Sequence, residues 1–116
     1  MRFILLVCWD GERLEAEPEP EPGTRDEDES FPWLDDLRER GQWLGGDRLA
    51  PPRRARTVRV RRKERLVTDG PFAETKEVVG GFDLIEADSL EEAVEIAAGH
   101  PVAEFGTIEV RPLWGQ

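Results

Sequence analysis

The chain has 116 residues and a formal net charge of −10, from 26 acidic and 16 basic side chains. This length provides one domain, residues 1–116, with a modest core, and the acidic excess disfavours duplex nucleic acid as a partner. A single cysteine excludes an intramolecular disulfide and a multi-cysteine zinc site. No apolar run is long enough to span a membrane and no cleavage site follows the N-terminal run, so we expect a cytoplasmic protein.

Two segments of opposite charge stand out. Residues 15–29, EAEPEPEPGTRDEDE, contain eight acidic residues and one arginine, with no apolar side chain larger than alanine. Such a segment cannot bury enough surface to offset its ordering entropy, so we predict that it is flexible. Residues 53–65, RRARTVRVRRKER, contain eight basic residues and one glutamate. The acidic segment competes for this basic stripe within the same chain, which further disfavours nucleic acid.

The first half of the chain predicts a strand, a helix and a second strand. The apolar run 3–9, FILLVCW, indicates a central strand buried on both faces, and it ends at the turn pair Asp10-Gly11. Residues 30–41 indicate a short helix, with a capping hydroxyl on Ser30 and Gly41 as its stop. Residues 42–49, QWLGGDRL, indicate a strand in which the paired glycines predict a bulge.

The second half predicts a hairpin, a strand, a helix and a last strand. Residues 57–67 alternate valine with arginine around a polar turn, which indicates a solvated hairpin arm. Residues 82–87 indicate another strand. The capping box of Ser89 and Glu92 begins a helix with apolar positions at i, i+3, i+4 and i+7. Residues 106–113, GTIEVRPL, alternate as a final strand does.

Without the arm, this order is the β-α-β-β-α-β arrangement of a ferredoxin-like α+β domain with an antiparallel sheet. Both predicted helices would cover one face of the sheet. The other face has apolar residues and no cover within the chain, and packing against a second copy would bury it. We therefore expect a homodimer.

Four motifs resemble the YCII-related, or DGPF-domain, family. They are DGPFAETKE at 69–77, GGF at 80–82, SLEEA at 89–93 and IEVRPL at 108–113. The resemblance implies a ferredoxin-like subunit that pairs into a dimeric α+β barrel. The wider fold includes isomerases, dehydrochlorinases, haem-dependent peroxidases and small monooxygenases, so the fold alone does not select a chemistry. In related members a histidine near the first helix, paired with an aspartate, has been proposed as an acid/base site, and residues 30–40 here contain no histidine.

Two residues are candidates for acid/base catalysis. Asp69 stands where a strand enters a Gly-Pro turn, and it could act as a general base if its surroundings raised its pKa. Aspartate before Gly-Pro is also a common turn former that accepts local backbone N–H groups. His100, the only histidine, has the pKa suited to proton transfer near neutral pH. Its alternative role is a partly exposed residue at a helix C-terminus.

The stretch 67–82 also predicts a ligand pocket. Glu74 and Lys76 could orient a polar ligand or merely solvate a loop, and Phe72 would anchor the loop. The two glycines at 80–81 leave room for close backbone approach to something small. Trp43 is the tryptophan that we place near a cavity.

No metal-ligand cluster, phosphate-binding glycine motif or dinucleotide fingerprint is present, so we expect no metal and no cofactor. The first hypothesis is a protein that binds a small metabolite in a cleft bordered by the DGPF loop, with any catalysis being cofactor-free. The second is a non-catalytic interaction module whose working surfaces are the acidic tract and the arginine-rich hairpin.

Overall fold

The computed structural model describes residues 1–23 and 31–116. The elements in chain order are β1 (Arg2–Asp10), α1 (Gly11–Ala16), α2 (Pro32–Glu39), β2 (Trp43–Arg48), η1 (Pro52–Arg54), β3 (Arg56–Arg61), β4 (Glu64–Asp69), β5 (Glu77–Glu86), α3 (Leu90–Ala98), η2 (Pro101–Glu104) and β6 (Thr107–Pro112). None of the helices in these ranges is long and apolar enough to cross a membrane.

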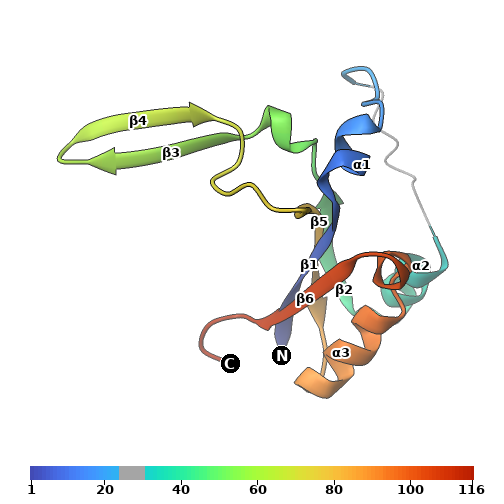
Figure 1. Cartoon of the computed structure of the whole chain (residues 1–116). Coiled ribbons are helices and arrows are strands. Elements are labelled where there is room, and N and C mark those ends of the chain that lie inside the picture. The colour runs from blue at the N-terminus through green and yellow to red at the C-terminus, as the bar shows by residue number, and fades with distance from the viewer. Residues whose placement is uncertain (24–30) are drawn as a thin grey trace.

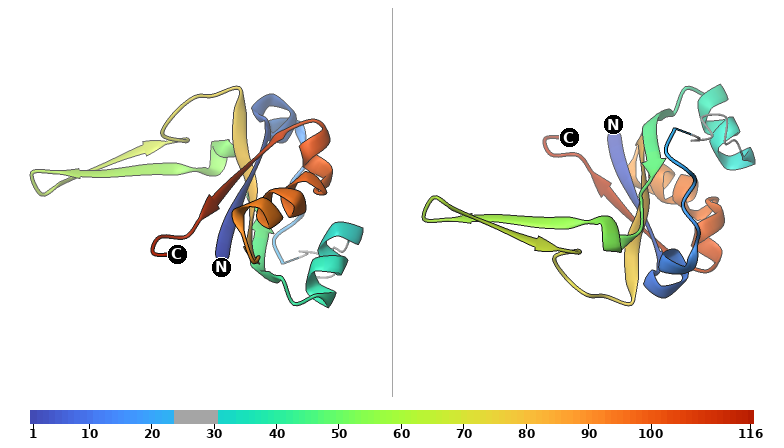
Figure 2. Two further views of the ribbon diagram at one scale, coloured as in Figure 1. Left: turned by 90° about the horizontal axis from the view of Figure 1, so that it is seen from below. Right: turned by 90° about the horizontal axis from the view of Figure 1, so that it is seen from above.

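The main sheet has four strands in the order β2-β5-β1-β6, and all three pairings are antiparallel. This is the strand order of a ferredoxin-like domain, with β1 and β5 in the centre. Helices α2 and α3 lie on one side of the sheet, and the hairpin of β3 and β4 projects on the other side (Figures 1 and 2). The α+β fold class predicted from the sequence is confirmed.

The core lies between the sheet and the two helices. Phe3, Leu5 and Ile85 are fully buried on the helix side of the sheet, where they pack with Leu37 of α2. Alanines and an isoleucine of α3 complete the cluster: Ala93, Ile96 and Ala97. Because side chains alternate along a strand, the core residues of β1 occupy every second position.

Strand β1 is buried on one face only, so the prediction of burial on both faces is wrong. Its burial alternates between buried and partly exposed residues from Phe3 to Asp10. The partly exposed face carries Ile4 and Leu6, which stand opposite Leu84 and Phe82 of β5. We call these four residues the open face. Nothing in the described part of the chain covers it as the helices cover the other side.

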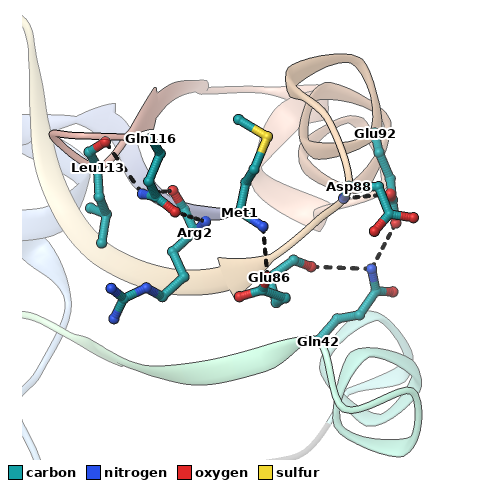
Figure 3. Close-up of polar contacts among 8 residues, drawn as sticks. All are labelled: Met1, Arg2, Gln42, Glu86, Asp88, Glu92, Leu113 and Gln116. Atoms are coloured by element: carbon teal, nitrogen blue, oxygen red, sulfur yellow. Dashed lines mark hydrogen bonds and ion pairs between the residues drawn. The ribbon is translucent and has the colours of Figure 1, made fainter.

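Helix α3 begins at the predicted capping box. The Ser89 hydroxyl accepts a hydrogen bond from the Glu92 N–H at 3.1 Å, while the Glu92 carboxylate accepts from the Asp88 N–H at 2.8 Å. The Gln42 amide also donates to Glu92 (2.7 Å) and to the Glu86 carbonyl (3.1 Å), as Figure 3 shows. These bonds lower the pKa of Glu92 and join the start of α3 to strands β2 and β5.

Two helix starts differ from the sequence predictions. Helix α1 was not predicted, although Asp10 caps it by accepting hydrogen bonds from the N–H groups of Glu12 and Arg13. Its Leu14 is buried against Val7 and Trp9 in a second small cluster. Helix α2 has Phe31 at its N-cap position without a side-chain cap. The predicted capping residue, at position 30, lies outside the described residues.

Strand β5 begins at Glu77, five residues earlier than predicted, so the glycine pair lies inside a strand. The pairing of β1 with β5 shifts between Val7 and Cys8, which leaves Gly80 as the extra residue of a bulge. A Cβ atom on Gly80 would overlap the indole ring of Trp9. The room beside this glycine is therefore filled by the protein's own tryptophan and not by a ligand.

The hairpin arm, defined as β3, β4 and their turn, forms a separate two-stranded sheet. Its strands pair from Arg56 with Asp69 to Arg61 with Glu64. Every residue of β4 is exposed, as are all residues of β3 except Thr57, which is partly buried. The predicted solvated arm is confirmed.

The Gly80→Ala substitution should destabilise the protein, because its methyl group would collide with the buried ring of Trp9. We expect the free energy of unfolding to fall by about 1 to 3 kcal/mol, the usual cost of overpacking, as measured by urea denaturation. Gly99→Ala is the control, because its nearest side-chain neighbour lies 3.4 Å from the added methyl group. Equal losses in both variants would contradict the packing argument.

Candidate functional site

A hollow of about 490 Å³ lies where the DGPF loop, residues 70–76, meets the open side of the sheet. We call it the loop hollow. Its lining residues come from the first strand, the segment after β2, the loop and β5: Cys8, Leu49, Ala50, Pro51, Pro52, Arg54, Ala55, Pro71, Ala73, Thr75, Glu77, Val78 and Val79. Most of these side chains are apolar, so the hollow suits a small ligand with little charge.

Cys8 places the chain's single thiol in the lining of the loop hollow. It is a free, partly exposed thiol on the side of β1 opposite the core. Burial raises its pKa, and the nearby carboxylates of Glu77 and Glu109 raise it further. Because the thiolate is the nucleophilic form, this environment makes Cys8 a poor nucleophile near neutral pH. The hollow is therefore better suited to binding than to covalent catalysis.

Asp69 does not line either hollow that we describe. It is the last residue of β4, its side chain is 90% exposed, and it forms an ion pair with Arg56 at 3.1 Å. This pair joins the two strands at the base of the arm. The Asp69 carboxylate is therefore the exposed partner of Arg56 and part of neither hollow.

His100 is buried on the helix side of the sheet, with an exposed fraction of 8%. Its Nδ1 atom accepts a hydrogen bond from the Val102 N–H at 3.0 Å, which caps η2. Its ring lies edge-on to the rings of Phe31 and Trp33. Burial lowers its pKa, so the ring is neutral near neutral pH. The prediction of a partly exposed histidine is wrong, and His100 does not line the loop hollow.

The other predicted pocket residues are dispersed. Phe72 is 76% exposed beneath the guanidinium of Arg59, so it does not anchor the loop against the core. It borders a second, smaller hollow of about 290 Å³ beneath the arm. Glu74 and Lys76 are exposed, and the Lys76 carbonyl accepts a hydrogen bond from the Gly11 N–H. None of these three side chains lines the loop hollow.

Trp43 belongs to a polar contact that the sequence analysis did not identify. Its indole N–H donates to the carboxylate of Asp83 at 2.9 Å, and the guanidinium of Arg38 lies over its ring. Asp83 is opposite Leu5 of β1, so it shares the core face of the sheet. Burial raises its pKa, and the bond from Trp43 opposes this effect. The sequence did contain a signal for this contact, because Asp83 stands between apolar residues of a strand. Side chains two positions apart in a strand share a face, so Asp83 points to the same side as the buried Ile85.

The first part of the acidic tract lies against the root of the arm. Glu15 forms an ion pair with Arg53 at 2.7 Å, and Glu19 forms one with Arg54 at 2.7 Å. Hydrogen bonding from Arg54 lowers the pKa of Glu19. Arg48, at the end of β2, pairs with Glu17. These contacts join the tract to η1 and β2, whereas residues 24–29 of the tract lie outside the described residues.

Within residues 1–23 and 31–116, no group of three or more His, Cys, Asp or Glu side chains could hold a metal ion. All buried side-chain polar atoms of these residues have hydrogen-bond partners.

Comparison with known proteins identifies the family. A family model described as "YCII-related domain" matches residues 1–115. An uncharacterised protein of Rhizobium meliloti (strain 1021) is 48% identical over 68 residues, which are 57% of this chain and 55% of the relative. The chain thus spans about half the length of the curated relative that it matches.

Replacing Asp83 by Asn should stabilise the protein near neutral pH. The raised pKa means that the folded state disfavours the carboxylate, so stability is lost as pH rises from the ordinary value of 3.8 through the folded pKa. Asparagine does not ionise, and its oxygen can still accept from Trp43. We expect Asp83→Asn to gain roughly 1 kcal/mol near neutral pH, a typical single-residue effect.

The measurement is urea denaturation of the parent protein and of Asp83→Asn from acidic to neutral pH. The other carboxylates affect both proteins equally, so their effect cancels when the two free energies of unfolding are subtracted. The gain should disappear below the ordinary aspartate pKa. Asp69→Asn is the control, since its carboxylate is 90% exposed and its loss should change stability by less than about 0.5 kcal/mol. A gain for Asp83→Asn that does not vary with pH would contradict the burial argument.

Proposed function

Since this chain belongs to the YCII-related family, we propose that it binds a small, mainly apolar molecule in the loop hollow and works as a homodimer. The matching relative is uncharacterised, so the proposal rests on the geometry of this chain. The observation that carries it is an apolar hollow of about 490 Å³ bordered by the family's DGPF segment. Volumes of this size hold small ligands in other proteins.

The lining defines the class of ligand. Leu49, Pro51, Pro71, Ala73 and Val79 provide apolar walls, which suit an aromatic ring or a short aliphatic chain. The carboxylates of Glu77 and Glu109 disfavour an anionic ligand near the Cys8 thiol. One polar edge on the ligand would find the Thr75 hydroxyl within the same lining. The proposed ligand is therefore a small neutral aromatic or aliphatic compound.

The proposal assigns binding to this site and no acid/base step. Asp69 is solvated and paired with Arg56, while His100 serves as the cap of η2 on the helix side. Neither residue belongs to the lining of the loop hollow. Asp83 has a raised pKa, but it lies on the core face of the sheet, whereas Cys8 lies on the other face.

The homodimer is supported by the open face. Ile4, Leu6, Phe82 and Leu84 form two adjacent cross-strand pairs that are only partly buried within one chain. A second copy packed on this face would remove their remaining apolar surface from water. The single free thiol fits a reducing compartment, so the cytoplasm remains the proposed location.

Filling the loop hollow tests the binding proposal. Ala73→Trp places a large side chain in the lining, whereas the control Ala103→Trp adds the same ring at an exposed position of η2. The probe is N-phenyl-1-naphthylamine, a neutral aromatic dye whose fluorescence reports apolar sites. We expect Ala73→Trp to weaken probe binding at least about tenfold, which is about 1.4 kcal/mol, and Ala103→Trp to leave it unchanged. Equal binding by all three proteins would refute a site in the hollow.

A second candidate function is an interaction module, and the ion pairs of the tract favour it. Glu15, Glu17 and Glu19 neutralise Arg53, Arg48 and Arg54, so the tract limits the basic surface that the chain presents. In this proposal the tract controls access of a polyanionic or acidic partner to the arginines.

Deleting residues 15–29 tests this second function. The deletion removes seven net negative charges and exposes the arginines at the root of the arm. We expect retention on heparin to rise sharply and to fall again with added salt, because the attraction is electrostatic. The matched control replaces the same acidic residues by serine, which keeps the chain length and should have the same effect. Heparin retention equal to that of the parent protein would eliminate this function.

A further inference from the structure

The hairpin arm is poorly supported by its own chain. It has a separate two-stranded sheet, and isolated hairpins of this size are marginally stable in water. Its turn places Arg62 and Lys63 at φ of 51° and 66°, in the left-handed region that glycine and asparagine favour. Neither the packing nor the turn chemistry of the arm therefore accounts for a stable, extended hairpin.

One face of the arm carries three exposed valines, with Arg65 opposite Val60. Val58 stands directly opposite Val67 across the hairpin, and Val60 follows two positions later on the same face. Their side chains are 59%, 53% and 58% exposed, respectively. Branched apolar side chains stabilise a hairpin when they are packed against another surface, and the described residues place none over this face.

The direction of the arm indicates where that surface comes from. The arm leaves the domain on the side of the sheet away from α2 and α3, which is the side of the open face (Figures 1 and 2). A second copy that covers the open face therefore lies beside the arm. The loop hollow is lined by Cys8 and Val79 of the sheet and by Ala55 and Pro71, which flank the arm, so it lies between the sheet and the root of the arm.

Charge complementarity also favours a second copy. Residues 56–65 contain six basic residues and one acidic residue, so they carry a net charge of +5, while the whole chain carries −10. The remainder of each copy is thus strongly acidic. Duplex nucleic acid would match the charge of the arm but not its valine face, and it would be repelled by the acidic body.

We propose that the hairpin arm clasps the second copy, with Val58, Val60 and Val67 packed against its surface and the basic side chains beside its carboxylates. This inference rests on the homodimer of the proposed function and adds the arm as a main source of its affinity. The contact removes the valines from water and holds the hairpin in its extended shape. The arm is then an interaction element specific for this chain.

The test compares the dimer dissociation constants of three variants by sedimentation velocity at physiological salt. The first replaces Val58, Val60 and Val67 by threonine, which preserves strand propensity and removes apolar surface. The second replaces residues 58–67 by Asn-Gly, so that Thr57 and Thr68 still pair across a two-residue turn. The matched control is Leu66→Thr, on the opposite face of the same hairpin.

We expect the triple variant and the armless variant each to weaken the dimer at least about tenfold, and Leu66→Thr to leave it within about twofold. Hydrogen exchange of the arm amides should also slow as the parent protein dimerises. Unchanged dimer affinity in both the triple and armless variants overturns the clasp while preserving the homodimer. A parent protein that is monomeric at every concentration overturns both. Arm-dependent binding of duplex DNA at physiological salt, with no effect on the dimer, overturns the clasp in favour of nucleic acid.

Discussion

The structure depends on a sheet with one face buried under helices and the other face only partly buried. Helices α2 and α3 bury Phe3, Leu5 and Ile85 on one face, and no helix of residues 1–23 and 31–116 covers the other face in this way. The open face therefore keeps apolar pairs that are only partly buried. The side chains that line the loop hollow and the projecting arm share this side. The loop hollow and the arm, to which we assign binding and association, thus both lie on the side of the sheet that α2 and α3 leave uncovered.

The bulge at Gly80 determines how the family segment meets that surface. The extra residue changes the register, so that Val79 and not Gly80 stands opposite Cys8. At the same point the indole of Trp9 occupies the space that a side chain on Gly80 would need. The glycine is required for packing between the two central strands, and the hollow follows from the shifted register. A motif residue can therefore be essential for the site without touching a ligand.

Some of the basic side chains form ion pairs within the chain, and others remain exposed. The acidic tract engages Arg48, Arg53 and Arg54 at the root of the arm, whereas the basic side chains farther along the arm stay exposed. Exposed ion pairs contribute little stability, so these contacts are not a main source of the free energy of folding. In the proposed clasp, the acidic body of one copy meets the basic arm of the other, which gives self-recognition.

The sequence by itself determined the order of the strands and of helices α2 and α3, the α+β class, the capping of α3 by Ser89 and the exposed arm, because periodicity and capping are local properties of the chain. Only the tertiary structure decided which side chains share a site. Asp83 meets Trp43 because β2 and β5 are adjacent, and His100 is buried because Trp33 packs on it from α2. Such contacts join residues far apart in the sequence, and their partners depend on strand register and helix packing, which no local pattern encodes.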